Sequence, residues 1–158
     1  FNLRLREALD EHAASGSPLA VLMCDVHAFT AYNDTYGHLA GDVALTAVAE
    51  ALTNVLRSKA ADLAARYGGE EFAVLLVECD AAEAAVVAQR MLNAVRALAI
   101  EHRSSDTAPH VTISIGIAAV VPTAMDSPEQ LLRCADEALY RAKAQGRDRM
   151  GGGPGLVG

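Results

Sequence analysis

The chain lacks the features of a nucleic-acid-binding surface, a disulfide framework or a membrane span. Thirteen Lys and Arg residues face twenty Asp and Glu residues, for a formal net charge of −7, so a nucleic-acid polymer is not an expected partner. The three cysteines form no CxxC pair, which argues against disulfides and a zinc cage. No apolar run approaches the roughly 20 residues that a membrane-spanning helix needs. We therefore expect a cytoplasmic chain without membrane contact.

The chain also has no initiator Met and no signal-peptide pattern at Phe1, so we expect it to be a piece of a longer protein. With 158 residues, of which 52% are hydrophobic and 21% charged, it has the balance of a globular chain that buries one core. We place that domain at residues 1–150. The segment GGGPGLVG at 151–158 has few side chains to bury, which predicts a flexible tail.

Amphipathic spacing predicts four helices. Leu45, Val48 and Leu52 recur at intervals of three and four, which is typical of a helix whose apolar face covers a sheet. Asp80 stands directly before an Ala-rich stretch, where its carboxylate can cap a helix. The predicted helices span residues 3–15, 41–58, 81–99 and 127–145.

Short apolar runs predict a sheet. The run LAVLMCDV at 19–26 ends in Asp25 and is typical of a central strand covered on both faces. Gly68-Gly69 predicts the turn of a tight hairpin, and 110–120 alternates like a strand with two different faces. The resulting order is the split βαβ arrangement of ferredoxin-like folds. We therefore predict an α+β palm with a central, mostly antiparallel sheet flanked by helices, the helices lying over one face.

Three carboxylates, Asp25, Glu70 and Glu71, stand at a strand end and a glycine turn that this topology can bring together. Carboxylates crowded at one point need a cation, and without a His/Cys cluster hard oxygen ligands favour magnesium over zinc. The alternative is two solvated glutamates on a hairpin. Gly68 and Gly69 would let a ligand approach the backbone, although turn geometry alone explains glycines there equally well.

The segment YGGEEF at 67–72 resembles the signature of the GGDEF domains, the diguanylate cyclases, which tolerates Glu at its third position. The block CDVHAFTAYNDTYGHLAGDVAL at 24–45 is similar to that family's pattern DxDxFKxxNDxxGHxxGDxxL, and the likeness runs from about residue 19 to 149. The resemblance implies a nucleotide-cyclase-like palm that condenses two GTP molecules into cyclic di-GMP and two pyrophosphates. It also implies a homodimer in which each domain supplies half of the site.

By position in these motifs, Asp25, Glu70 and the backbone carbonyl of Val26 would hold Mg²⁺ or Mn²⁺, with help from Glu71. Glu70 would also accept the proton of the attacking 3′-hydroxyl. The metal polarises the α-phosphate, so that in-line displacement needs little beyond positioning and charge.

Two further pairs match family positions that bind GTP. Asn33 and Asp42 match the guanine contacts, and their side chains can pair with the donors and acceptors of that base. Alternatively, Asn33 caps a turn and Asp42 caps the next helix. Lys143 and Arg147 match the triphosphate-binding pair. Read without the resemblance, they are cations at a helix C-terminus.

The sequence departs from the family pattern at two positions beside these residues. His27 replaces the usual second Asp, which removes a carboxylate near the metal site. Thr30 replaces the usual Lys, and losing one preorganised cation can cost several kcal/mol of activation barrier. These changes predict slow or absent turnover. We expect His38, which has no partner Cys or His nearby in the sequence, to pack or hydrogen-bond under the nucleotide loop in a structural role.

Many family members carry an inhibitory product site, RxxD, just before the glycine turn. The matching positions here are Lys59 and Asp62, and Arg90 resembles a secondary contact. Lys lacks the bidentate fork of Arg, which predicts weak feedback by cyclic di-GMP. Solvated side chains on helix surfaces are the alternative for Lys59 and Arg90.

Three functions follow from these residues. The first is a diguanylate cyclase with a sensory or regulatory domain upstream. The second, motivated by His27 and Thr30, is a degenerate domain that binds GTP or cyclic di-GMP as a receptor. The third is a related palm enzyme that acts on another nucleotide.

Overall fold

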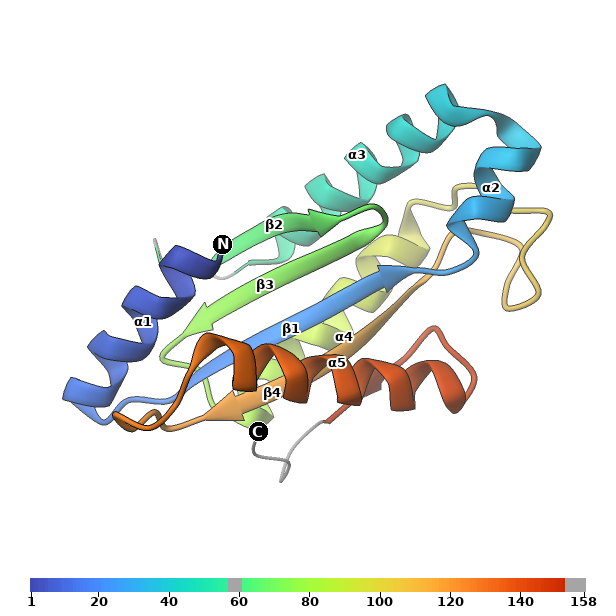
Figure 1. The fold of residues 1–158 in the computed structure, drawn as a ribbon. Coiled ribbons are helices and arrows are strands. Elements are labelled where there is room, and N and C mark those ends of the chain that lie inside the picture. Colours follow the sequence, from blue (N-terminus) through green and yellow to red (C-terminus); the bar gives the residue numbers. More distant parts are fainter. Residues whose placement is uncertain (57–60, 153–158) are drawn as a thin grey trace.

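A five-stranded sheet forms the centre of the molecule (Figure 1). The computed structural model describes residues 1–56 and 61–152. The strand order is β2-β3-β1-β4-β5, antiparallel except for β5, which runs parallel to β4. This confirms the predicted mixed palm with a mostly antiparallel sheet. The strands are β1 Leu19–Val26, β2 Leu63–Gly68, β3 Glu71–Val77, β4 Ile113–Val120 and β5 Met150–Gly151.

Helices cover both faces of the sheet (Figure 1), so the prediction of one covered face was wrong. Ala20, Leu22 and Cys24 of β1 pack with the cluster that includes α3 and α4, whereas the alternate residues pack with α1 and α5. Both sets are fully apolar, and a strand buried on both faces needs helices on both sides. The helices are α1 Asn2–Ser15, α2 Phe29–Tyr36, α3 His38–Val55, α4 Ala81–Ala97 and α5 Pro128–Ala144.

Local chemistry explains where several helices begin. Asp80 accepts a hydrogen bond from the Glu83 N–H at 2.8 Å, which confirms the predicted cap of α4. Ser127 and Gln130 form a reciprocal capping box at the start of α5. The sequence did not predict α2 as a separate helix. Gly37, with φ of 92°, separates α2 from α3.

The packing of α5 on β4 depends on a glycine. A Cβ at Gly116 would lie 2.1 Å from the Ala135 carbonyl oxygen and 2.3 Å from the Leu139 nitrogen. Only glycine allows this approach, because the obstructing atoms are backbone. The close contact fixes the position of α5 along β4, and with it the place where the C-terminal end of α5 meets the end of β1.

The expected tail begins inside the sheet. Gly151 belongs to β5, and Gly152 is buried against the Ile117 carbonyl oxygen. The rest of that segment, 153–158, lies outside the described residues. Within the described ranges, no helix has both the length and the apolar character to span a bilayer.

Candidate functional site

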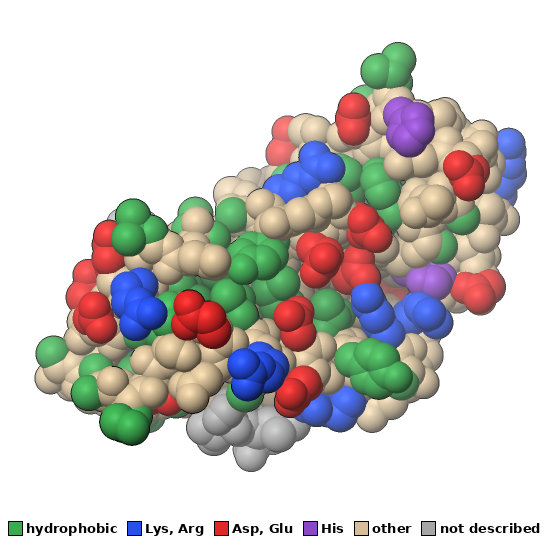
Figure 2. All heavy atoms as spheres, viewed as in Figure 1, with side chains coloured by type: hydrophobic (Ala, Val, Ile, Leu, Met, Phe, Trp, Pro, Cys, Tyr) green, Lys and Arg blue, Asp and Glu red, His purple; other side chains and the backbone are tan. Residues whose placement is uncertain are grey.

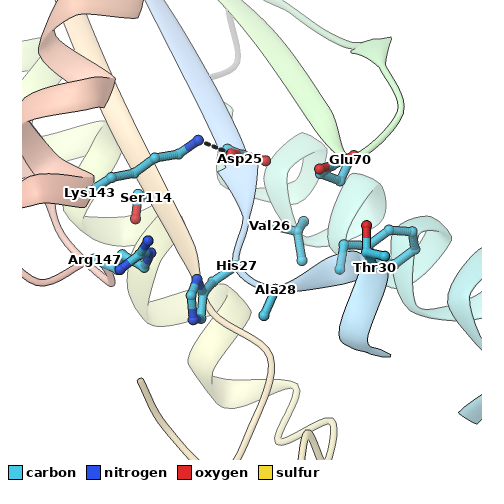
Figure 3. Close-up of a pocket in the computed structure, with 10 residues that line it drawn as sticks. Asp25, Val26, His27, Ala28, Thr30, Glu70, Ser114, Lys143 and Arg147 are labelled. Carbon is cyan, nitrogen blue, oxygen red and sulfur yellow. Dashed lines mark ion pairs between the residues drawn. The ribbon is translucent and has the colours of Figure 1, made fainter. Parts of the chain in front are cut away.

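A cleft of about 270 Å³ opens at the end of β1, between the β2–β3 hairpin and the end of α5 (Figure 3). Acidic and basic side chains gather on this side of the molecule, which the space-filling view shows (Figure 2). The cleft therefore brings together groups that are far apart in the sequence. Its lining residues are Asp25, Val26, His27, Ala28, Phe29, Thr30, Glu70, Ser114, Lys143 and Arg147.

Asp25 lies at the centre of this arrangement, at a register position between Glu71 of β3 and Ser114 of β4. Its side chain is only 14% exposed, and Lys143 forms an ion pair with its Oδ2. Figure 3 shows Lys143 reaching from α5 to Asp25, with Glu70 on the other side. The Oδ1 atom is buried and has no hydrogen-bond partner within the described part of the chain. Asp25 thus keeps one acceptor oxygen available for a ligand.

The hairpin places Glu70 within the turn, whereas the prediction placed it directly after the turn. Gly68 pairs with Glu71, so Gly69 and Glu70 form the two-residue turn rather than Gly68 and Gly69. A register shift after Arg66 moves the turn, and Gly69 alone of the two glycines has a positive φ, of 28°. The Val26 N–H donates to the Glu70 carbonyl oxygen at 3.2 Å, which ties the turn to the end of β1.

Glu71 lies in β3, outside the cleft lining. Burial raises the pKa of its carboxyl group above the usual value, and the nearby carboxylates of Asp25 and Asp136 raise it further, while Lys143 lowers it. This crowding of like charges favours a cation nearby. The structure therefore places Glu71 beside Asp25 and Glu70, but does not aim it into the same cavity.

The turn from β1 into α2 is strained at the cleft. Ala28 adopts a left-handed conformation, with φ of 53° and ψ of 42°, which costs a non-glycine residue roughly 1 to 3 kcal/mol. The neighbouring His27 bonds through Nε2 to Asp106 Oδ1 at 2.8 Å. That bond is the main reason that the pKa of the Asp106 carboxyl lies below its usual value.

Lys143 and Arg147 both reach the cleft, although they do not lie on one helix. The helix ends at Ala144, and Arg147 and Asp148 follow in left-handed conformations, with φ of 62° and 50°. Arg96 holds the Asp148 carboxylate at 2.9 Å, and the Asp148 N–H donates to Ser114 Oγ at 3.2 Å. This anchored turn directs Arg147 into the cleft, rather than the helical spacing of residues 143 and 147.

Asn33 and Asp42 lie outside the cleft, at the neighbouring corner of α2 and α3. Neither is a side-chain cap: Asn33 accepts from the Gly37 N–H through its backbone, and Asp42 lies inside α3. The Asn33 Oδ1 is buried and unpaired among the described residues. Gly41 makes room for it, because a Cβ there would lie 1.8 Å from that oxygen. The predicted packing of His38 was wrong, since its side chain is exposed at the start of α3.

The predicted product site is only partly described. Lys59 lies outside the described residues. Asp62 precedes β2, and its Oδ1 accepts a hydrogen bond from the Val77 N–H at 3.0 Å. Arg90 is exposed on α4. The assignment of these three residues stays a prediction.

Sequence reasoning missed Ser114, Ala28 and Asp106 as parts of the site. Ser114 had a usable signal, because it is a polar residue in an otherwise apolar strand. Ala28 had no such signal, since its role depends on a backbone conformation. Asp106 had none either, because it bonds to His27, which lies 79 residues earlier in the sequence. Phe29 also lines the cleft.

Comparison with known proteins agrees with the fold and the motifs. The family described as "Diguanylate cyclase, GGDEF domain" matches residues 1–149. The chain therefore belongs to the GGDEF family. It is 41% identical over 132 residues to Diguanylate cyclase A of Treponema denticola, covering 84% of this chain and 34% of that protein. It is 39% identical over 137 residues to Response regulator PleD of Caulobacter vibrioides, covering 87% and 30%. The chain thus spans about a third of the length of these relatives.

Solved GGDEF domains share the architecture. The GGDEF domain of DgcB from Caulobacter crescentus, solved in complex with c-di-GMP, superposes with a TM-score of 0.84 at 30% identity, covering 96% of this chain and 86% of that one. The GGDEF domain of PA1120 from Pseudomonas aeruginosa gives a TM-score of 0.80 at 38% identity, covering 95% and 91%. Both likenesses extend over nearly the whole chain.

Proposed function

We propose that this domain condenses two GTP molecules into cyclic di-GMP and two pyrophosphates, with Mg²⁺ or Mn²⁺ and as a homodimer. The observation that carries the proposal is the cleft itself, where two carboxylates, Asp25 and Glu70, face two cations, Lys143 and Arg147. Carboxylates that hold a metal and cations that hold phosphates are the parts that phosphoryl transfer requires.

The residues fit a divalent ion of the magnesium type. Asp25 has a buried oxygen with no partner in the described part of the chain, and Glu70 and the Val26 backbone line the same cleft. Among the described residues, no group of three or more His, Cys, Asp or Glu side chains is arranged to hold a metal. This is consistent with an ion that takes its other ligands from water and phosphate oxygens. When bound, the ion would polarise the α-phosphate and favour ionisation of the attacking hydroxyl.

The chain's own groups then divide the work. Lys143 exchanges its ion pair with Asp25 for one with the triphosphate, which leaves Asp25 free to bind the metal. Arg147 binds the phosphates beside it, and Glu70 accepts the proton of the 3′-hydroxyl. The 3′-oxygen forms a bond to the α-phosphorus, and the bond to pyrophosphate breaks. Glu71, beside Asp25, contributes negative charge to the metal site.

Recognition of the base falls to the corner of α2 and α3. The unpaired Asn33 oxygen and the exposed Asp42 carboxylate accept from the N1–H and amino group of guanine, which adenine does not offer in the same pattern. At the hairpin, Gly68 and Gly69 leave open space for an incoming nucleotide. Apart from chain neighbours, no atom of the described residues lies within 4 Å of the place where a Cβ would stand at either residue.

The requirement for a dimer follows from the structure of the product, cyclic di-GMP. Cyclic di-GMP has two phosphodiester bonds, and each is made by the 3′-hydroxyl of one GTP on the α-phosphate of the other. Two clefts must therefore face each other, each holding one GTP. Upstream elements of a longer protein would hold the two copies together, and a cytoplasmic location supplies GTP. Feedback through Lys59, Asp62 and Arg90 is expected to be weak.

A second function, a receptor for GTP or cyclic di-GMP, is favoured by one observation. Thr30 lines the cleft where the family pattern has Lys, so a cation is lacking at a position that faces the reacting phosphates. A hydroxyl donates one hydrogen bond but does not offset developing negative charge.

Product formation separates the two functions. The chain is incubated with GTP and Mg²⁺ at high protein concentration, and nucleotides are resolved by chromatography. A cyclase forms cyclic di-GMP, and Glu70→Gln lowers the rate about a hundredfold or more. Glu137→Gln, an exposed glutamate of α5, is the matched control and keeps the wild-type rate. GTP binding without product would favour the receptor, and the absence of both would contradict both functions.

A further inference from the structure

The loop between α4 and β4 lies against α2 (Figure 1). Within this loop, His102 is 1% exposed and places Nε2 3.1 Å from the Ala28 carbonyl oxygen. Because a carbonyl oxygen only accepts, Nε2 carries the hydrogen and donates it. The ring also packs edge-on against Tyr32, with centroids 5.2 Å apart. A buried imidazole therefore supports the turn that carries the cleft wall.

This hydrogen bond supports a conformation that the sequence alone disfavours. Ala28 has left-handed dihedrals without being glycine. Its carbonyl oxygen accepts from both His102 and the Tyr32 N–H, the latter at 3.0 Å. The residues on either side of Ala28, including His27 and Thr30, line the cleft. Fixing the Ala28 peptide thus fixes the wall against which a nucleotide would lie.

The rest of the loop is bonded along α2. The Tyr36 hydroxyl accepts from the Arg103 N–H at 2.9 Å and donates to Glu101 at 3.1 Å. The Thr35 hydroxyl donates to Ser104 Oγ at 3.1 Å. Asp106 reaches back to His27. These contacts make the loop a second support for α2, beside α3.

We propose that residues 102–109 form a strap that holds the β1–α2 turn in its nucleotide-binding shape, with His102 as the positioning residue. His102 does not line the cleft and acts through the Ala28 carbonyl. Without that donor the Ala28 peptide relaxes toward ordinary dihedrals and moves the Val26 carbonyl, His27 and Thr30. The proposal deepens the proposed function and rests on it, because it concerns the same GTP cleft.

Two substitutions at His102 test the donor. His102→Phe keeps a ring against Tyr32 and removes the N–H, whereas His102→Gln keeps an N–H donor. By analogy with partners that orient metal ligands, we expect His102→Phe to weaken GTP binding about tenfold or more, measured by calorimetric titration with Mn²⁺. We expect His102→Gln to bind GTP within about threefold of wild type, since the donor is retained. Where turnover is measurable, kcat and KM are determined separately for both variants.

A conformational readout accompanies the titration. Hydrogen exchange of the Tyr32 amide, which is bonded to the Ala28 carbonyl oxygen, is expected to quicken in His102→Phe and not in His102→Gln. Tyr36→Phe, which removes only the hydroxyl that joins the strap to α2, is expected to quicken exchange at Arg103 with a smaller loss of GTP affinity. This variant keeps its ring and tests the strap without altering a buried imidazole.

His12 provides the matched control. It is also buried, at 7% exposure, with Nδ1 2.8 Å from the Ala8 carbonyl oxygen and Nε2 accepting from the Glu78 N–H at 3.3 Å. It lies at the other end of the sheet, so His12→Phe is expected to lower the melting temperature without changing GTP affinity or Tyr32 exchange.

The outcomes separate the two proposals. The strap is overturned if His102→Phe binds GTP like wild type, or if His12→Phe lowers GTP affinity equally. If wild type binds no GTP, the proposed function fails, and Tyr32 exchange alone decides the strap. Faster exchange in His102→Phe than in wild type and His12→Phe then supports it, and unchanged exchange overturns it.

Discussion

The two ends of β1 differ in whether their buried side chains find partners within the chain. From Leu19 to Cys24 every residue is at most 1% exposed and packs on both faces of the sheet. At the other end, three buried side-chain oxygens, of Asp25, Asn33 and Thr112, have no hydrogen-bond partner within residues 1–56 and 61–152. Native proteins rarely leave such atoms unpaired. The packed end is filled by apolar side chains of its own chain, whereas the cleft end keeps acceptor oxygens that are unpaired within the described residues.

The largest effect is expected at the packed end. Gly116→Ala would push a Cβ into the backbone of α5, so we expect the free energy of unfolding to fall by about 3 kcal/mol, the upper range for overpacking. Urea denaturation measures the loss. Gly68→Ala is the control, because among the described residues nothing but its chain neighbours lies within 4 Å of its Cβ position. Equal stability of the two variants would mean that α5 does not need the close approach.

At the cleft end, Thr30→Lys is expected to raise the rate of cyclic di-GMP formation about tenfold or more, since it restores a cation beside the reacting phosphates. The rate is measured with GTP and Mg²⁺ at one protein concentration for both chains. If wild type is inactive and the variant turns over, the natural domain is a receptor. An unchanged rate in an active enzyme would show that this part of the cleft does not face the developing charge.

Gly41→Ala sharpens the contrast between the ends. Its Cβ would meet the flexible Asn33 side chain and the edge of Phe29 rather than backbone. We expect Asn33 to turn away, so that GTP affinity falls about tenfold through the loss of one hydrogen bond to the base. The free energy of unfolding should change by less than about 1 kcal/mol. A loss of stability without a loss of GTP affinity would remove Asn33 from base recognition.

The smallest effect concerns Glu71. Its pKa is raised in the folded chain, so the folded state holds this proton more tightly than the unfolded state, and stability is lost as pH rises through the raised pKa. In metal-free buffer, the melting temperature of wild type relative to Glu71→Gln is therefore expected to fall as the pH rises above 4.5, the ordinary value for Glu. A difference that is constant with pH would show that neither burial nor the carboxylates of Asp25 and Asp136 raise the pKa of Glu71.

Sequence patterns predicted the parts of the fold that packing determines. The apolar run of β1 and the Asp80 cap followed from periodicity and turn chemistry, as did the chain order of the elements other than α2 and β5. The second covered face was missed because 110–120 alternates in residue type, although Gly116 is there to admit a helix rather than to face water. The hairpin turn was misplaced by one residue because a register shift cannot be read from Gly68-Gly69 alone.

The residues of the candidate site could be predicted from the sequence, but their arrangement in space could not. Asp25, Glu70, Lys143 and Arg147 were all predicted, and the structure brings them to one cleft. The ion pair between Asp25 and Lys143 and the left-handed turn that directs Arg147 depend on how α5 ends. No spacing rule encodes that ending. The strap from 102 to 109 could not be predicted either, because its partners on α2 are distant in sequence.

The most direct test of the central claim is the amount of product formed when two cleft ends are held face to face. The chain is fused to a parallel dimerising helix and supplied with GTP and Mg²⁺, and cyclic di-GMP and pyrophosphate are quantified. We expect one cyclic di-GMP for every two pyrophosphates, and the loss of both products in Glu70→Gln. GTP that stays intact in the fused dimer, although it binds, would contradict an active cyclase.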